Sequence, residues 1–307
     1  MNFSPLTCYQ SSLASLSRTA VTAMLAVSLI LSSLGCSQSS EESQVSKQDT
    51  LDAGLAALRV FDFEQSYEIF QQLSASVQKD EEMWPLVTYS FGVSAWLKTP
   101  TTEEGVAEAV RLLDLLSKEK PKSIYTASAL LDLGRITEIS NFRGDTTDVV
   151  TARRYYERVR AEFPNTEMAI RATLFLAQTY VQTLTPADIH KAIDLLDACI
   201  QEPANAAWVG LIAQYIGVLY EQYLDHPKKA IDPYMQAAQA GLARHADTDS
   251  VLWHIGVLAE RAGRDQLAAK AYSQIISDFP RTVYRSVSQE RLEQIQKEAS
   301  KKETDRR

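Results

Sequence analysis

The side chains best suited to bind a metal or act as nucleophiles are few and widely spaced. The chain of 307 residues has 4 histidines and 3 cysteines. His245 and Asp247 are close enough in sequence to act as a pair of metal ligands, but no third ligand lies beside them. The remaining histidines, which lie in distant parts of the chain, are His190, His226 and His254. The sequence therefore leaves a metal site open only across distant segments, and we expect no cofactor.

Motifs of common catalytic sites are absent from the sequence. It has no phosphate-binding glycine loop, no Gly-x-Ser-x-Gly elbow, no His-Glu-x-x-His pair and no Cys-x-x-Cys pair. Adjacent carboxylates such as Glu81 and Glu82 lie in polar stretches, where water solvates them. No nucleophile has a base at helical spacing. We therefore predict that the protein is not an enzyme and has no small-molecule substrate.

The cysteines differ in their surroundings. Cys8 lies near the N-terminus, and Cys199 lies in an apolar stripe, where we expect a small core hydrophobe. Cys36 ends a stretch in which residues 1–18 carry one cation, Arg18, and no acid, and residues 19–34 are uncharged and mostly apolar. This is the layout of a secretory signal. Residues 1–35 are therefore predicted to be a signal peptide.

The Gly35-Cys36 junction resembles the end of a bacterial lipoprotein signal, in which a small residue precedes the acylated cysteine. The resemblance implies cleavage before Cys36, a diacylglyceryl group on its sulfur and a membrane anchor. Ser33 departs from the family pattern, which prefers Leu there. An uncleaved signal anchor and ordinary cleavage nearby remain the alternatives.

The composition that follows the cysteine bears on the protein's location. Residues 36–49 are rich in Ser, Gln and Glu and are predicted to form a lipidated flexible tether. In lipoproteins an aspartate after the cysteine favours the inner membrane, so Ser37 favours an exported protein that faces the periplasm from the outer membrane. The formal net charge of −8 disfavours nucleic acid as a partner.

A pattern of small and large residues recurs along the rest of the chain. Five of the 11 glycines occupy the same position of a repeated pattern. Each is followed by a small residue, then by a large residue four positions after the small one, and then by a third residue that is mostly apolar. The large residues after Gly134, Gly217 and Gly256 are tyrosines, and Ala177 replaces glycine in another copy. The copies begin at Gly54, Gly92, Gly134, Ala177, Gly217 and Gly256. Two of them carry longer turns, at Lys98–Glu104 and Asn141–Thr147.

These copies resemble the tetratricopeptide repeat, a helix–turn–helix unit of about 34 residues. The resemblance implies an all-α fold, an α-α superhelix of about six helical hairpins. We expect this solenoid over residues 50–281, a C-terminal capping helix over 282–300 and a frayed tail over 301–307. The expected inner stripe of the capping helix is Val283, Val287, Leu292 and Ile295.

In this repeat family the first helix of each hairpin lines a concave surface that binds protein segments. The matching positions are candidate partner-binding residues: Tyr89, Trp96, Arg135, Gln178, Gln214, Glu221 and Trp253. The same mapping adds Leu131, Glu138, Gln182 and Glu260. The aromatic residues could instead pack between helices, and that alternative stays open.

Two Phe-Pro-x-Thr corners, at 163–166 and 279–282, resemble those of envelope lipoproteins and periplasmic coordinators. The outer-membrane barrel-assembly lipoproteins are similar in design, although the inserted turns depart from them. We therefore hold two hypotheses for a non-catalytic, lipid-anchored protein. It is either an adaptor that binds peptide segments in the concave face or a structural subunit of an envelope-assembly machine.

Overall fold

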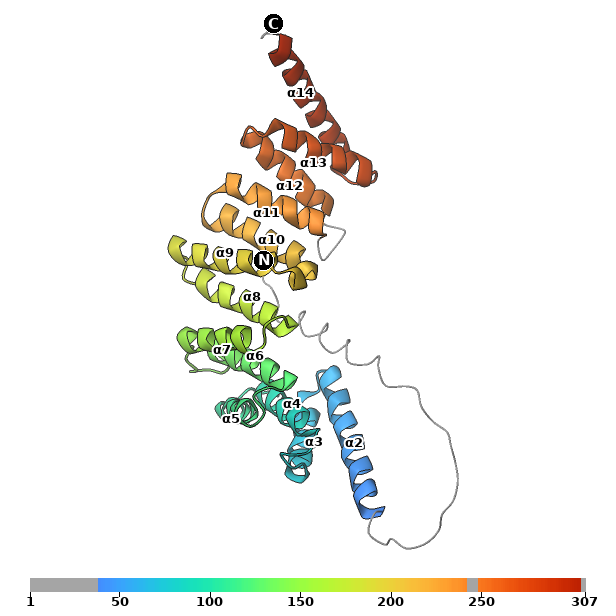
Figure 1. Cartoon of the computed structure of the whole chain (residues 1–307), viewed down its shortest axis with the longest axis vertical. Helices are drawn as coiled ribbons and strands as arrows, with labels where there is room; N and C mark the ends of the chain where they lie inside the picture. Colours follow the sequence, from blue (N-terminus) through green and yellow to red (C-terminus); the bar gives the residue numbers. More distant parts are fainter. Residues whose placement is uncertain (1–37, 242–247, 305–307) are drawn as a thin grey trace, which may run out of the picture. The chain divides into compact units, whose positions relative to one another are not determined.

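A computed structural model describes residues 38–241 and 248–304. The predicted all-α class is confirmed, since the described residues contain thirteen α-helices and no strand (Figure 1). Twelve of the helices pair into six hairpins: α2 (Gln38–Arg59) with α3 (Phe63–Ser76), α4 (Trp84–Leu97) with α5 (Glu103–Glu119), α6 (Ile124–Glu138) with α7 (Val149–Glu162), α8 (Glu167–Val181) with α9 (Pro186–Gln201), α10 (Val209–Val218) with α11 (Pro227–Ala240), and α12 (Thr248–Arg261) with α13 (Asp265–Asp278). The last helix is α14 (Arg285–Thr304).

Two short helical segments flank α10. The 3₁₀ helix η3 (Pro203–Trp208) precedes it, and the π-helical turn η4 (Leu219–Tyr223) continues it. The chain forms two compact units. Among the described residues, the first unit holds 38–129 and 140–145, and the second holds 130–139, 146–241 and 248–304.

The repeated glycines allow the two helices of a hairpin to pack closely. A Cβ atom built on Gly134, Gly217 or Gly256 would collide with the ring of a tyrosine on the second helix. A Cβ atom built on Gly54 would likewise lie only 2.8 Å from the Phe70 ring. The predicted small and large residues are buried in every hairpin: Ser66 and Phe70, Ala109 and Leu113, Ala152 and Tyr156, Ala192 and Leu196, Ala230 and Tyr234, and Ala268 and Tyr272.

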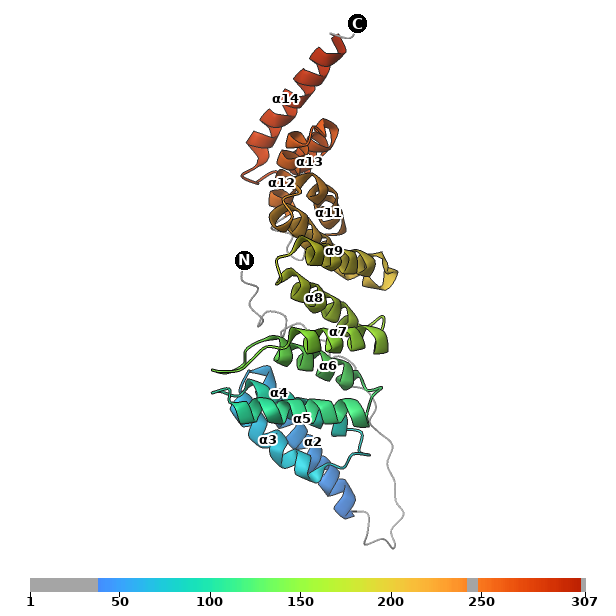
Figure 2. The ribbon, with the colours of Figure 1, turned by 90° about the vertical axis from the view of Figure 1, so that its left-hand side faces the viewer.

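Within the second unit, each second helix packs on the first helix of the next hairpin. One apolar cluster joins α8 and α9 with α10, and another joins α11 with α12, α13 and part of α14. Both views show α12 and α13 side by side (Figure 1 and Figure 2). Cys199 is a buried free thiol of the first cluster, as expected of a small core residue.

The start of the fold differs from the prediction. Residues 38–49, predicted as a flexible tether, form the first half of α2. Leu51 and Ala57 are buried and fix the second half of this helix, and extending an existing helix costs far less than nucleating one. Lys47 also forms an ion pair with Glu81 at 2.9 Å, which holds the extension in place. The predicted signal peptide and Cys36 lie outside the described residues.

The C-terminal boundary also differs. The capping helix α14 begins at Arg285 instead of 282 and continues through 301–304, which were predicted to be frayed. Val283 precedes the helix and is 84% exposed, so it does not belong to the inner stripe. Leu292 and Ile295 do pack against the last hairpin. No helix in the part of the chain that the structure describes is both long and apolar enough to cross a bilayer.

Candidate partner-binding surface on the first helices

The candidate residues of the second unit lie on consecutive first helices. Arg135 is on α6, Gln178 on α8 and Gln214 on α10, while Glu221 lies in η4 and Trp253 on α12. Gln178 is exposed, and the other four are half-buried. A helical repeat places equivalent positions on equivalent faces, so the small–large packing that aligns each hairpin also sets the direction of these side chains.

The two candidates of the first unit, Tyr89 and Trp96, both lie on α4. The ring of Tyr89 is 6.2 Å from that of Tyr125. The Trp96 indole N–H donates to the Asn141 side-chain oxygen at 2.8 Å. Each half-buried aromatic residue therefore combines an internal contact with a remaining exposed portion.

A buried carboxylate lies at the end of α6. Glu138, whose side chain is 1% exposed, accepts hydrogen bonds from the Tyr156 hydroxyl at 2.6 Å and from Gln182 at 3.0 Å. Arg135 forms an ion pair with it at 3.1 Å and lies over the Phe175 ring, 4.6 Å from its centroid. Burial, followed by the charge of Glu138, raises the pKa of Tyr156, which keeps this hydroxyl a donor. Because a buried charge must be paired, these contacts form a connected unit.

The same arrangement recurs around η4. Glu221 accepts a hydrogen bond from the Tyr234 hydroxyl at 2.9 Å and lies 2.8 Å from His254 Nε2 of the following first helix. The His254 ring packs edge-on against Tyr234, with 5.5 Å between the ring centroids. Burial, with the Glu221 hydrogen bond next, raises the pKa of Tyr234. Glu221 therefore connects its own hairpin to the next.

A third copy joins α12, α13 and α14. Arg291 forms an ion pair with Glu260. Burial, followed by the charge of Glu260, raises the pKa of Tyr272. The Tyr272 hydroxyl lies near this carboxylate, but it has no hydrogen-bond partner of good geometry among the described residues. Glu260 and Tyr272 therefore interact through charge alone, whereas the other two glutamates accept a hydrogen bond from their tyrosines. Trp253 stacks on Tyr284 with 5.7 Å between centroids, so part of its surface is used internally.

These three contacts follow a pattern in the sequence that relates one position of the first helix to one position of the second. The residue four positions after the repeated small residue is Glu wherever the large residue of the second helix is Tyr: Glu138 with Tyr156, Glu221 with Tyr234, and Glu260 with Tyr272. It is apolar wherever the large residue is Phe or Leu: Leu58 with Phe70, Trp96 with Leu113, and Val181 with Leu196. We call the first set the Tyr–Glu pins. Several glutamates assigned to the binding face therefore also hold the hairpins together.

The histidines do not converge on a metal site in the described residues. His190 Nδ1 lies 2.7 Å from the carbonyl oxygen of Pro186, and His226 precedes α11. Within the described ranges, no three metal-ligating side chains lie together. The His245 and Asp247 pair lies outside the described residues.

Comparison with known proteins agrees with this geometry in the last hairpin. A family profile described as tetratricopeptide repeat matches residues 250–282, which span α12 and α13. The chain thus carries a tetratricopeptide repeat at this hairpin, and its fold is a tetratricopeptide-like solenoid. No curated protein matches the chain.

Solved structures are similar at low identity. The MamA RS-1 ArsTM double mutant is 16% identical with a TM-score of 0.44, and covers 63% of this chain and 93% of its own. Apo RapI is 11% identical with a TM-score of 0.45, over 78% of this chain and 79% of its own. A tetratricopeptide repeat protein from Parabacteroides merdae ATCC 43184 is 12% identical with a TM-score of 0.37, over 82% of this chain and 99% of its own. At TM-scores this low, the likenesses carry no argument about function.

Proposed function

We propose that the protein is a non-catalytic, lipid-anchored scaffold on the periplasmic side of the outer membrane, and that it binds protein partners through its first helices. The solenoid fold supports the interaction role. The resemblance of residues 19–36 to a lipoprotein signal supports the anchor at Cys36.

One observation carries the interaction proposal. The Tyr–Glu pins use the glutamates of the first helices internally and leave amide side chains on the same face. Gln178 is exposed on α8, and Gln214 is half-buried on α10. An amide side chain both donates and accepts hydrogen bonds, so it matches the peptide groups and polar side chains of a protein partner. Because the pins fix the helices that carry these amides, little backbone freedom is lost on binding.

Site-specific photo-cross-linking tests the interaction surface. A photoreactive residue at Gln178 should give discrete partner adducts in cells. The matched control is Glu157, which is exposed on the second helix α7 of the preceding hairpin, and it should give none. Adducts of equal yield at both positions, or none at Gln178, would remove the first-helix face from the proposal.

The anchor is tested separately by mass spectrometry of the N-terminus of protein taken from membranes. An acylated Cys36 that disappears in a Cys36→Ala variant is the expected result. An intact N-terminus or a plain cleaved one would instead support the signal anchor or the soluble exported form. Neither outcome affects the cross-linking test.

A second candidate function, a subunit of an envelope-assembly machine, is favoured by the ordered insertion between α6 and α7. The Asn141 backbone N–H and its side-chain amide both donate to Asp145 at 2.8 Å, and Trp96 bonds to the same Asn141. An insertion built in this way can present a fixed surface. Shortening 141–147 should abolish association with the partner if this candidate holds, and should leave the Gln178 adducts intact if the adaptor holds.

A further inference from the structure

An unusual backbone position recurs in the turn of four hairpins. The residue two before the second helix has a positive φ in each: Phe61 (62°), Leu184 (56°), Asp225 (53°) and Gly263 (71°). Glycine adopts this conformation without strain and Asp tolerates it, whereas a bulky apolar residue does so at a cost. Leu184 is in addition 68% exposed, so it combines backbone strain with exposed apolar surface. Phe61 at least packs edge-on against Phe63, at 6.1 Å between centroids.

A depression of about 390 Å³ lies between the start of α7 and the end of α8, and one of its lining residues, Thr183, directly precedes Leu184 in the chain. Val150, which is 60% exposed, lies on its α7 side, and Thr183, the neighbour of Leu184, lies on its α8 side. The full lining is Val149, Val150, Arg153, Thr179, Gln182 and Thr183. An exposed aliphatic side chain, Val150, thus borders a depression that contains a guanidinium, and the exposed Leu184 follows the lining residue Thr183 in the chain.

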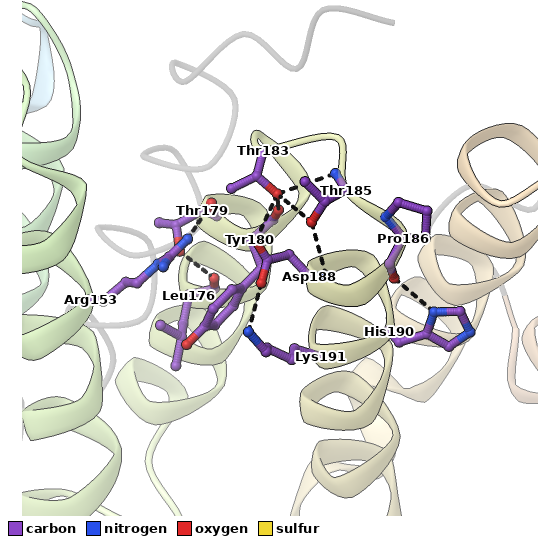
Figure 3. A network of polar contacts seen from close by, with 10 residues as sticks. All are labelled: Arg153, Leu176, Thr179, Tyr180, Thr183, Thr185, Pro186, Asp188, His190 and Lys191. Carbon is purple, nitrogen blue, oxygen red and sulfur yellow. Dashed lines mark hydrogen bonds and ion pairs between the residues drawn. The ribbon is translucent and has the colours of Figure 1, made fainter.

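Arg153 is held in this depression entirely by neutral groups. Its Nε and Nη2 atoms donate to the Thr179 hydroxyl and carbonyl oxygens, each at 2.9 Å, and the guanidinium lies 3.9 Å from the centroid of the Tyr180 ring. Figure 3 shows Arg153 reaching from one helix to Thr179 on the next. In the same view, Lys191 is neutralised by Asp188 at 2.7 Å. No carboxylate of the described residues pairs with Arg153, so its charge is positioned but not compensated.

We propose that this edge, formed by Val150, Arg153 and Leu184, docks a peptide segment in which an aliphatic side chain lies within a few residues of a carboxylate. The aliphatic group covers Val150 and Leu184, and the carboxylate pairs with the Arg153 guanidinium, whose planar donors suit it. The proposal rests on the proposed role as a protein-binding scaffold and adds a second surface at the hairpin turns. The exposed side chain of the strained Leu184 forms part of this contact.

A displayed library of random peptides, selected on the purified protein, tests the proposal. Selection should enrich peptides with an aliphatic residue followed within about three positions by Asp or Glu. Replacing that acid by its amide in a synthetic copy should weaken binding at least about tenfold, because a charge-assisted hydrogen bond is lost. This peptide-side change requires no protein variant.

Protein variants locate the contact. Arg153→Gln should weaken the same peptide at least about tenfold, and Leu184→Gly should weaken it by about threefold. The matched control is Arg158→Gln on the same helix, because Arg158 already pairs with Glu162 at 2.8 Å. The affinity of this variant for the peptide should stay within about twofold of the wild type.

Three results would overturn the proposal: no enrichment of acidic peptides, equal losses for the Arg153 and Arg158 variants, or binding only to vesicles containing anionic phosphatidylglycerol. If cross-linked adducts form at Gln178 but any of these results is found, the docking edge is rejected and the proposed scaffold function stands. Failure at both surfaces would remove the scaffold itself.

Discussion

The α12–α13 and α8–α9 hairpins reach the same packing by two different means. In α12–α13, Gly256 makes room for Tyr272, and Glu260 lies near its hydroxyl. In α8–α9, Ala177 faces the smaller Leu196 within a wholly apolar cluster. In these two hairpins the small residue matches the size of its opposing residue. In all six hairpins a glutamate follows the small residue only where the opposing side chain is tyrosine.

The difference has a consequence for the neighbouring helices. A pin extends beyond its own hairpin, because Glu138 also bonds to Gln182 at the C-terminal cap of α8 and Glu221 also bonds to His254 on α12. Hydrogen bonds are directional, whereas apolar contacts tolerate rotation. The pins should thus fix the orientation of the next first helix, which carries the proposed binding residues.

The largest expected effect comes from filling the space beside a pinned tyrosine. Gly256→Ala should destabilise the protein by about 3 kcal/mol, since the new methyl group collides with the Tyr272 ring and outweighs the gain in helix propensity. Ala177→Gly, in the apolar hairpin, should cost about 1–2 kcal/mol, because helix propensity and a buried methyl group are both lost. Urea unfolding measures both, and a Gly256→Ala protein as stable as the wild type would contradict the close approach.

Next in size is the conversion of a pinned hairpin to the apolar type. Glu138→Leu should cost about 2 kcal/mol, since it strands the buried Tyr156 hydroxyl. Adding Tyr156→Phe should recover about 1–2 kcal/mol of that loss, because no polar group is then left unpaired. Chemical denaturation of the two single variants and the double variant gives the coupling energy, and additive losses would show that the two residues act independently.

The sequence contained most of the fold and only part of the site. The spacing of five glycines and Ala177 predicted the six hairpins, because close helix approach requires a small residue whatever else surrounds it. The Tyr–Glu rule was present in the sequence, but linking Glu138 to Tyr156 requires knowing that a hydroxyl at the tip of one side chain reaches the end of another helix. The extension of α2 was missed because polar composition alone does not show that a packed helix follows.

A smaller, pH-dependent effect separates the two hairpin types. The pKa of Tyr156 is raised above its ordinary value of 10.0, so the stability from its neutral form is present below pH 10 and lost as the pH rises above it. Above pH 10, each such tyrosine adds up to about 1.4 kcal/mol per pH unit to the decrease in the free energy of unfolding. Stability curves of wild type and Tyr156→Phe should therefore converge above pH 10. Parallel curves would contradict a shifted tyrosine.

The smallest effect concerns the strained turn. Leu184→Gly should leave stability unchanged or raise it by up to about 1 kcal/mol, because glycine relieves the positive φ of 56°. Thermal unfolding measures the change. A clear loss of stability would mean that Leu184 serves the fold, and the docking edge would lose its reason for an exposed leucine.

The central claim, that the first helices bind the partner, is tested most directly by affinity. Once cross-linking at Gln178 has identified a partner, its Kd is measured for Gln178→Arg and for the second-helix control Glu157→Arg. We expect at least about a tenfold loss of affinity for Gln178→Arg and less than about twofold for the control. Equal losses, or none at Gln178, would contradict it.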